Sequence, residues 1–270
     1  MNHLSKKLVA LGLAFGLAAL AAHPAEARAE TNDALVVKPT VDVPLTLGAG
    51  ALFLTLFLTP HRQGVILDQT VGPKKGLDSL GVLKLNEGVA HVSDYLLFGG
   101  IAAGLGLVAY DGARHGRFGT RTLLYVEAMM MVGVATEITK WAVRRARPYT
   151  LDPDGDGRLG EQDDDLSFFS GHTSSTAGWT FAAVRILDLS HDWPAWMRGV
   201  GYGGAVLLTA SMATMRVMAG KHWPTDVLVG AFVGGALGWV VPELHRKELP
   251  VSLAVAPVPG GAHLAVSATF

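Results

Sequence analysis

The chain has 270 residues, of which 50% are apolar and 17% are charged, and it contains no cysteine. This charged fraction lies below the roughly 25% that is typical of soluble domains, which favours a membrane protein or an unusually apolar helical protein. A net charge of −1 gives no basis for nucleic-acid binding. The lack of cysteine excludes disulfides, thiolate metal sites and a thiol nucleophile.

The N-terminus has the order of a secretory signal peptide. Lys6 and Lys7 precede an apolar run over 8–22, and the small residues Ala25 and Ala27 frame a cleavage site. An uncleaved anchor is the alternative, although the run is shorter than the ~20 residues of a membrane helix. We therefore expect a signal peptide over 1–27, followed by a linker over 28–44.

Six apolar segments then predict one all-α domain over 45–250. Their lengths and periodicity favour helices, several of them near the ~20 residues that a bilayer requires. The segments are 45–59, 90–110, 121–139, 173–188, 198–219 and 225–242. We expect a six-helix, membrane-embedded bundle.

Two further features of the sequence concern helix packing and the C-terminal tail. Small residues such as Gly230, Gly234, Gly235 and Gly238 suit close helix packing within a membrane. The tail 251–270 carries a weak β-hairpin signal.

Basic residues cluster where the third helix is expected to end. Lys140, Arg144 and Arg147 share one face of a helix that continues to Pro148. Cations at a bilayer edge are costly unless an anion binds there, and guanidinium and ammonium groups suit phosphate oxygens. Taken alone, Lys140 is more often a helix-end lysine, and Arg144 with Arg145 a membrane-edge charge pair.

Two histidine-containing groups follow. Ser170-Gly171-His172 predicts a helix N-terminus, where free N–H groups and the helix dipole favour an anion. His222 and Asp226 are four residues apart, and a carboxylate that fixes one imidazole nitrogen leaves the other free to attack phosphorus. Singly, each residue has an ordinary interpretation as an N-cap, an interfacial histidine or a first-turn acid.

Helix order brings these groups together. In an up-and-down bundle the ends of helices three and five and the starts of helices four and six meet at one end. Cations, one histidine to attack and one to protonate a leaving oxygen together make a phosphoryl-transfer site. The acids within apolar segments are expected to pair inside the bundle, namely Asp94, Glu127 and Glu137. Other histidines are expected at loops or interfaces, namely His91, His115 and His191.

In these residues the chain resembles the superfamily of type 2 phosphatidic acid phosphatases (PAP2) and vanadium haloperoxidases. That family carries the motifs K-x6-R-P, P-S-G-H and S-R-x5-H-x3-D. The corresponding stretches here are 140–148, 169–172 and 215–226. Phe169 stands where the family has proline, and Met215 where it has serine. The resemblance covers residues from about 85 to 245.

The resemblance implies a role for each motif residue. It implies that phosphate is bound by Lys140, Arg147, Ser170, the Gly171 amide and Arg216. His222 would be the nucleophile that forms a phosphohistidine, His172 the general acid and Asp226 the orienting partner of His222. Chemistry of this kind requires no cofactor in the family.

An acidic segment between the first two motifs fits an EF-hand calcium loop. Over 152–163, acids fall at positions 1, 3, 5 and 12 and glycine at position 6. The candidate Ca²⁺ ligands are Asp152, Asp154, Asp156, Arg158 through its backbone carbonyl, and Asp163. Aspartate at position 12 reaches less far than the usual glutamate, and a solvated acidic loop is the alternative.

The membrane side of the site depends on the first segment. After a cleaved signal, six crossings place the site in the cytoplasm, in agreement with the four Lys/Arg residues of 61–88. A secretion signal and a calcium loop suit the periplasm, which requires that 45–59 does not span. Because that segment has only about 15 residues, we expect an inner-membrane protein of the bacterial envelope with a periplasmic site.

The expected function is hydrolysis of phosphate monoesters or pyrophosphates, mainly of membrane lipids. One alternative is an acid phosphatase of the same fold that acts on soluble small molecules. Others are a vanadium-dependent haloperoxidase, with vanadate bound by His222, and a non-enzymatic anion-binding membrane protein. The last does not explain two histidines accompanied by Asp226. The expected partners are a phosphorylated substrate and the membrane, not nucleic acid.

Overall fold

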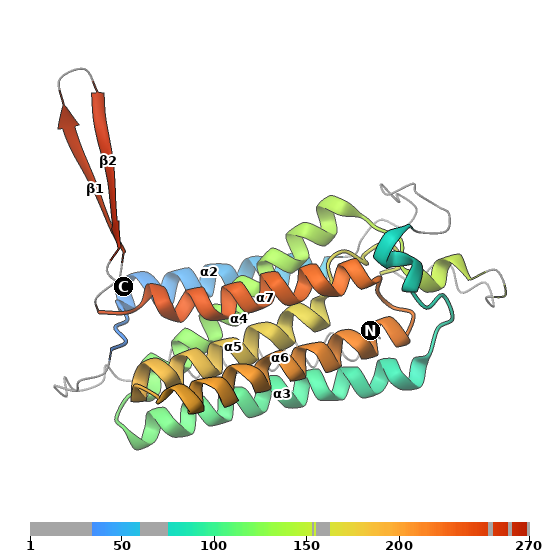
Figure 1. Cartoon of the computed structure of the whole chain (residues 1–270), viewed down its shortest axis with the longest axis horizontal. Coiled ribbons are helices and arrows are strands. Elements are labelled where there is room, and N and C mark those ends of the chain that lie inside the picture. Colours follow the sequence, from blue (N-terminus) through green and yellow to red (C-terminus); the bar gives the residue numbers. More distant parts are fainter. Residues whose placement is uncertain are drawn as a thin grey trace.

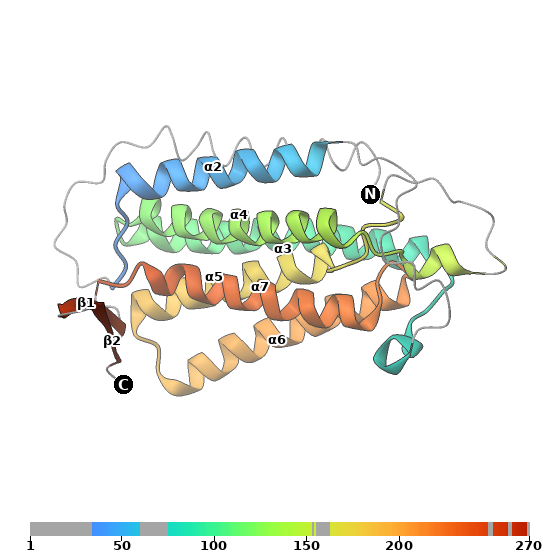
Figure 2. The same cartoon turned by 90° about the horizontal axis from the view of Figure 1, so that it is seen from above.

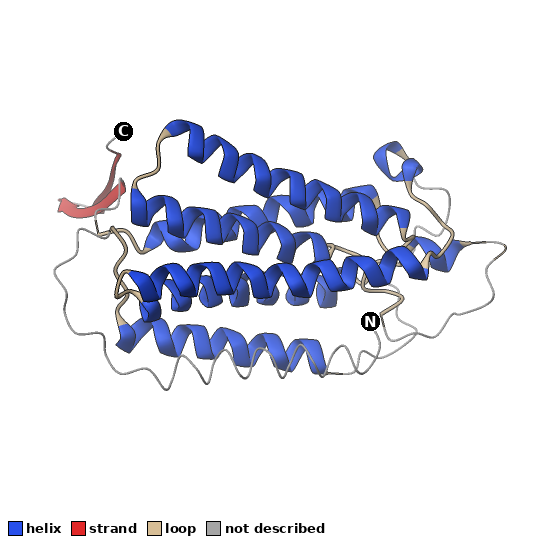
Figure 3. Ribbon diagram, turned by 90° about the horizontal axis from the view of Figure 1, so that it is seen from below, coloured by secondary structure: helices blue, strands red, loops and turns tan. Residues whose placement is uncertain are grey.

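The structure, a computed structural model, describes residues 34–59, 75–152, 154, 163–247, 251–258 and 261–268. Within these ranges the chain forms six α-helices that run side by side along one long axis (Figures 1 and 3). They are α2 (Pro39–Leu58), α3 (Glu87–Arg114), α4 (Phe118–Val143), α5 (Gly171–His191), α6 (Ala195–Met218) and α7 (Pro224–Leu244). The expected all-α, six-helix bundle is confirmed, whereas the expected signal peptide over 1–27 lies outside the described residues.

Helix α5 lies inside the bundle, where it packs against α3, α4, α6 and α7. Apolar residues such as Ala182 and Ile186 are buried on it, together with small polar residues such as Thr173 and Thr180. The Thr180 hydroxyl is satisfied within the helix, because it donates to the Thr176 carbonyl at 2.7 Å. Helix α5 can therefore place hydroxyl groups such as that of Thr180 inside the bundle with their hydrogen bonds made within the helix.

Helices α5 and α7 approach each other closely because α7 carries glycine every fourth residue. A Cβ atom added at Gly230, Gly234 or Gly238 would lie 2.8, 2.0 or 2.5 Å from a backbone oxygen of α5. Only glycine allows this spacing, as in the small-residue interfaces of membrane helices. The contact fixes the start of α5 against the start of α7.

The outer faces of the bundle are apolar. Among the residues that the structure describes, four segments are long and apolar enough to cross a membrane, namely α2, α3, Phe118–Leu151 and α7. Large apolar side chains are exposed on several helices, including Leu52, Leu107, Leu207 and Phe232. Apolar surface spread over several neighbouring helices suits contact with lipid, as in a membrane protein.

Helix α2 begins earlier than expected. It starts at Pro39 and has 20 residues, so that 39–44 belong to the helix and not to the linker predicted over 28–44. Proline is favourable in the first turn, and the Asp42 carboxylate accepts a hydrogen bond from the Lys38 N–H at 2.5 Å. The helix is about 30 Å long, enough to cross a bilayer.

The first described residues meet the segment that follows α7. Leu35 forms an isolated antiparallel bridge with Arg246, and the Val36 N–H donates to the His245 carbonyl. Strands β1 (Val251–Val258) and β2 (Gly261–Ala268) then form the antiparallel hairpin indicated for the tail.

Candidate active site

The four expected helix ends lie together at one end of the bundle. The end of α4 and the starts of α5 and α7 lie at the same end as the end of α6 (Figure 2). Two short 3₁₀ helices, η1 (Gly76–Leu80) and η2 (Pro148–Leu151), flank them. Motif residues that are far apart in the sequence therefore share one region.

His222 lies between α6 and α7 and is only 2% exposed. Its Nδ1 lies 2.8 Å from the Ser167 carbonyl oxygen, so Nδ1–H donates and Nε2 keeps its lone pair. Nε2 lies 3.4 Å from Nη1 of Arg147. The unprotonated nitrogen of His222 thus faces a cation directly.

Asp226 supports His222 mostly through Ser167. Its Oδ2 lies 3.7 Å from Nδ1 of His222, beyond hydrogen-bond distance. The same carboxylate accepts hydrogen bonds from the Ser167 hydroxyl and from the Trp223 N–H, while Arg145 binds its other oxygen. The expected orienting partner is therefore close, but the Ser167 carbonyl makes the direct contact.

Arg147 reaches the site in a different way from that predicted. Helix α4 ends at Val143, and Arg144 takes a left-handed conformation with φ 49°. Arg147 lies beyond the helix in extended backbone, and its N–H donates to the Asp164 carbonyl. The predicted shared helix face of Lys140, Arg144 and Arg147 is wrong, because bonds to the following segment replace the last helical turn.

Three hydrogen bonds hold the Arg147 side chain in place. Nε donates to the Asp163 carbonyl at 2.7 Å, Nη2 to Oδ2 of Asp163 at 2.9 Å, and Nη1 to the Lys221 carbonyl at 3.0 Å. Burial raises the pKa of Asp163, but Arg147 more than offsets this and holds the pKa well below its usual value. The guanidinium is thus fixed with Nη1 toward His222.

The same contact bears on the predicted calcium loop. Asp163 would be its twelfth position, and this carboxylate binds Arg147. Asp152 and Asp154 are described, and the Asp154 N–H donates to the Asp152 carboxylate at 3.1 Å. Asp156 and Arg158 lie outside the described residues, so the loop stays a prediction.

The second histidine, His172, is held from α3. Its Nε2 lies 2.6 Å from Oδ1 of Asp94. Nη1 of Arg216 lies 3.6 Å from the same Asp94 oxygen and donates to the Ser93 hydroxyl at 2.8 Å. Asp94 does pair within the bundle as expected, but its partners are two residues of the site. An acid inside an apolar segment was the signal that could have placed it there.

Lys140 and the start of α5 complete the group. A Cβ atom at Gly171 would lie 3.2 Å from Nζ of Lys140, so the lysine reaches the first residue of α5. Nζ also donates to Glu137 at 2.8 Å. Ser170 caps α5 by accepting from the Thr173 N–H, and its own N–H donates to the Asp226 carbonyl. The start of α5 is thereby tied to the start of α7.

Several cations act on one imidazole. Burial, followed by Arg147, Arg216 and Lys140, lowers the pKa of His222 well below its usual value. These three cations come from α4, the segment after it and α6. Arg147 lies next to the nitrogen that carries a free lone pair, and a set of cations of this kind suits the binding of a tetrahedral anion.

The two other arginines of the cluster have structural partners. Arg144 is buried and forms an ion pair with Asp165. Arg145 binds both Asp226 and Asp78 of η1. Asp78 also accepts from the Thr225 N–H at 3.0 Å, so η1 is attached to the start of α7. This role of η1 could not be predicted from the residues alone, since carboxylates in loops are usually solvated.

Fold and site together define a helical membrane protein with a buried histidine set among three cations. The PAP2 superfamily model matches residues 121–250. Two relatives are 30% identical over 166 residues, 61% of this chain and 81% of theirs. They are the decaprenylphosphoryl-5-phosphoribose phosphatases of Mycobacterium tuberculosis strains CDC 1551 / Oshkosh and ATCC 25618 / H37Rv. The chain belongs to the PAP2 superfamily.

Two solved structures are similar to this chain at low sequence identity. The transmembrane PAP2 type phosphatidylglycerolphosphate phosphatase from Bacillus subtilis is 20% identical, with a TM-score of 0.42. The match covers 86% of this chain and 93% of that one. A bacterial vanadium-dependent chloroperoxidase is 18% identical, with a TM-score of 0.40, over 64% of this chain and 47% of its own.

Proposed function

We propose that this protein is a membrane phosphatase that hydrolyses a phosphate monoester or pyrophosphate of a lipid through a phosphohistidine intermediate. The observation that carries the proposal is the 3.4 Å between Nε2 of His222 and Nη1 of Arg147. A phosphate bound by Arg147 would present its phosphorus to the free lone pair of the imidazole. Proximity of this kind is the first requirement for nucleophilic attack.

In the first step Nε2 of His222 forms a bond to phosphorus, and the bond from phosphorus to the leaving oxygen breaks. Lys140, Arg147 and Arg216 bind the phosphoryl oxygens, where negative charge is concentrated. The imidazole becomes cationic, and its Nδ1–H stays bonded to the Ser167 carbonyl at 2.8 Å.

His172 supplies the proton that the leaving oxygen takes up. Burial and the nearby Arg216 lower the pKa of His172, whereas the Asp94 carboxylate, 2.6 Å from Nε2, opposes this shift. A bound phosphate adds negative charge that acts in the same direction as Asp94, toward the imidazolium that an acid requires. In the second step water attacks the phosphohistidine. His172, now neutral, accepts the proton of that water, inorganic phosphate leaves and His222 is restored.

A lipid substrate is supported by the position of the site and by the relatives. The site lies at the end of an apolar bundle, where a headgroup can reach it while the lipid tail stays in the bilayer. The two mycobacterial relatives are decaprenylphosphoryl-5-phosphoribose phosphatases, and the compound in their name contains a decaprenyl group. We therefore propose an anionic lipid phosphate in preference to a soluble ester.

Phosphate release from lipid and soluble phosphates by wild-type protein and by His222→Ala tests the function. We expect kcat to fall by at least about 1000-fold, because without the imidazole of His222 no phosphohistidine can form. Brief incubation with ³²P-labelled substrate followed by alkaline denaturation should trap an acid-labile label in wild-type protein and none in His222→Ala. His91→Ala, a matched change of an exposed histidine, should retain full turnover.

Two results would count against the proposal. Equal turnover by wild type and His222→Ala removes this residue from the mechanism. A kcat/KM that is higher for soluble esters than for lipid phosphates assigns the protein to the alternative, a phosphatase of small molecules.

A further inference from the structure

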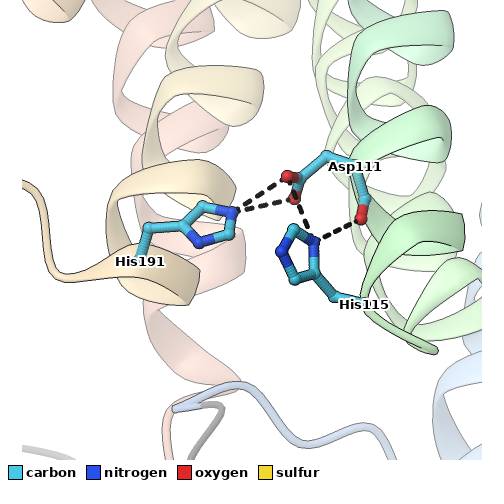
Figure 4. Close-up of side chains that lie close together, drawn as sticks. All are labelled: Asp111, His115 and His191. Carbon is cyan, nitrogen blue, oxygen red and sulfur yellow. Dashed lines mark hydrogen bonds and ion pairs between the residues drawn. The ribbon is translucent and has the colours of Figure 1, made fainter.

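A second group of chemically active side chains lies at the opposite end of α3 and α5. Asp111 and His115 are in the last turns of α3, and His191 is the last residue of α5 (Figure 4). Seventeen residues separate Asp94 from Asp111, which is about 26 Å along the helix. This group is therefore independent of the phosphate site, and no step of the proposed mechanism uses it.

The three side chains point toward one another. Nε2 of His191 lies 2.9 and 3.1 Å from the two carboxylate oxygens of Asp111. The rings of His115 and His191 meet edge to face, with centroids 4.9 Å apart. One ligand atom from each residue can be chosen so that all three lie within 4.8 Å of one another.

This spacing matches the coordination of a small divalent ion. Ligand atoms about 2.0 Å from a tetrahedral Zn²⁺ are about 3.3 Å apart, close to the separation of His191 from Asp111. The side chains of His115, His191 and Asp111 are 49%, 30% and 17% exposed, respectively. Water can therefore reach the ion and complete its coordination. Two imidazoles and one carboxylate are a donor set that zinc and similar ions prefer.

The surrounding bonds orient these ligands. Nδ1 of His115 donates to the Asp111 backbone carbonyl at 2.8 Å, which leaves Nε2 with its lone pair. One carboxylate oxygen of Asp111 is bound by Arg121, which leaves the other for an ion. Histidine ligands that donate to a carbonyl and carboxylate ligands that accept a hydrogen bond are typical of protein metal sites.

We propose that Asp111, His115 and His191 bind a divalent transition-metal ion of the zinc type, which ties α3 to α5 at the end of the bundle remote from the phosphate site. The ion takes the place of the proton now shared between His191 and Asp111. Because Arg121 lies on the same carboxylate and its charge opposes the ion, we expect micromolar rather than nanomolar affinity.

The experiment uses full-length protein in detergent, without an affinity tag and stripped of metal. Zinc binding is measured by isothermal titration calorimetry, and thermal unfolding is followed with and without Zn²⁺. We expect one zinc per chain at this site and a rise in Tm of roughly 5 °C at saturation. His115→Ala and His191→Ala should each weaken zinc binding by at least about tenfold and remove the rise in Tm.

His91→Ala is the matched control, because it changes an exposed histidine at the other end of the same helix. It should bind zinc as the parent does. His191→Gln keeps an amide N–H toward Asp111 and provides a second variant if His191→Ala unfolds. Absence of zinc binding by the parent, or equal affinity in the parent, His115→Ala and the His191 variants, overturns the proposal. Both readouts are independent of phosphatase activity.

Discussion

At the scale of single residues, the setting of His222 determines how activity depends on pH. Burial and the cations Arg147, Arg216 and Lys140 lower its pKa well below the usual 6.5. A histidine with a lowered pKa stays neutral, and therefore nucleophilic, as the pH falls below 6.5. The acid limb of kcat/KM that reports on His222 should thus lie below pH 6.5.

The measurement is kcat/KM against pH, corrected for the second ionisation of the phosphate substrate. Lys140→Met removes one of the cations, so it should move this acid limb to higher pH while reducing kcat/KM. Lys247→Met removes a lysine at the other end of the bundle and should leave the limb unchanged. An acid limb above pH 6.5 that Lys140→Met does not move would contradict the assignment.

The same shift affects stability with a definite sign. Because the folded state binds the His222 proton more weakly than the unfolded chain, the unfolded chain takes up more protons below pH 6.5. This histidine therefore stabilises the fold above its unfolded pKa of about 6.5, and its contribution is lost progressively as the pH falls below that value.

Site residues that act through a charged or imidazole side chain could be predicted from the sequence, whereas one that acts through its backbone could not. Lys140, Arg147, His172 and His222 were found because charged and imidazole side chains at fixed spacing point to phosphate chemistry. Ser167 was missed because its contribution to His222 is a backbone carbonyl, which every residue possesses. An acid within an apolar segment indicated that Asp94 pairs inside the bundle, but a single sequence does not identify its partner, a histidine 78 positions away.

At the scale of elements, the contact between α5 and α7 controls the geometry of the site. Gly234→Ala would place a methyl group 2.0 Å from the Ser174 carbonyl oxygen, so the two helices must separate. Overpacking of this kind typically costs about 1–3 kcal/mol. Because Ser170 and His172 start α5, we expect a lower Tm and at least a tenfold fall in kcat/KM.

Gly235→Ala is the matched control for this change. A Cβ atom there would lie 3.6 Å from the ring of Phe181, which is ordinary van der Waals contact. Its Tm and kcat/KM should remain close to those of wild type. Equal effects of the two substitutions, measured by thermal unfolding and phosphate release, would show that close approach to α5 is not what Gly234 provides.

Element types were predictable from apolar periodicity, whereas two boundaries were not. Helix α2 extends back to Pro39 because Pro39 and Asp42 are favourable in a first turn, although such residues are also typical of linkers. Helix α4 ends at Val143, before Pro148, because Arg147 bonds to a segment 16 residues further along. Tertiary bonds of this kind override a local stop signal.

At the scale of the whole molecule, the site and the first described residues lie at opposite ends. Residues 34–36 contact the end of α7, whereas the site lies at its start. If α2 spans the bilayer, a site facing the periplasm requires residue 35 to lie in the cytoplasm. The 20 residues of α2 remove the argument that the first segment is too short to cross. If the N-terminal signal exports residue 35 to the periplasm, a spanning α2 then places the site in the cytoplasm.

Single cysteines can decide the orientation, because the natural chain has none. Lys84→Cys and Arg114→Cys place exposed thiols before and at the end of α3. A membrane-impermeant maleimide applied to intact spheroplasts should label one of the two and not the other. Labelling of Lys84→Cys means a periplasmic site, and labelling of Arg114→Cys means a cytoplasmic one. Equal labelling of both would show that α3 does not cross the membrane.

The glycines of α7 also restrict the path of a substrate. Where Gly230, Gly234 and Gly238 meet the α5 backbone, no space remains for a hydrocarbon tail. An acyl or prenyl chain attached to the phosphate therefore cannot pass between these two helices. Lateral entry from the bilayer has to use another seam of the bundle.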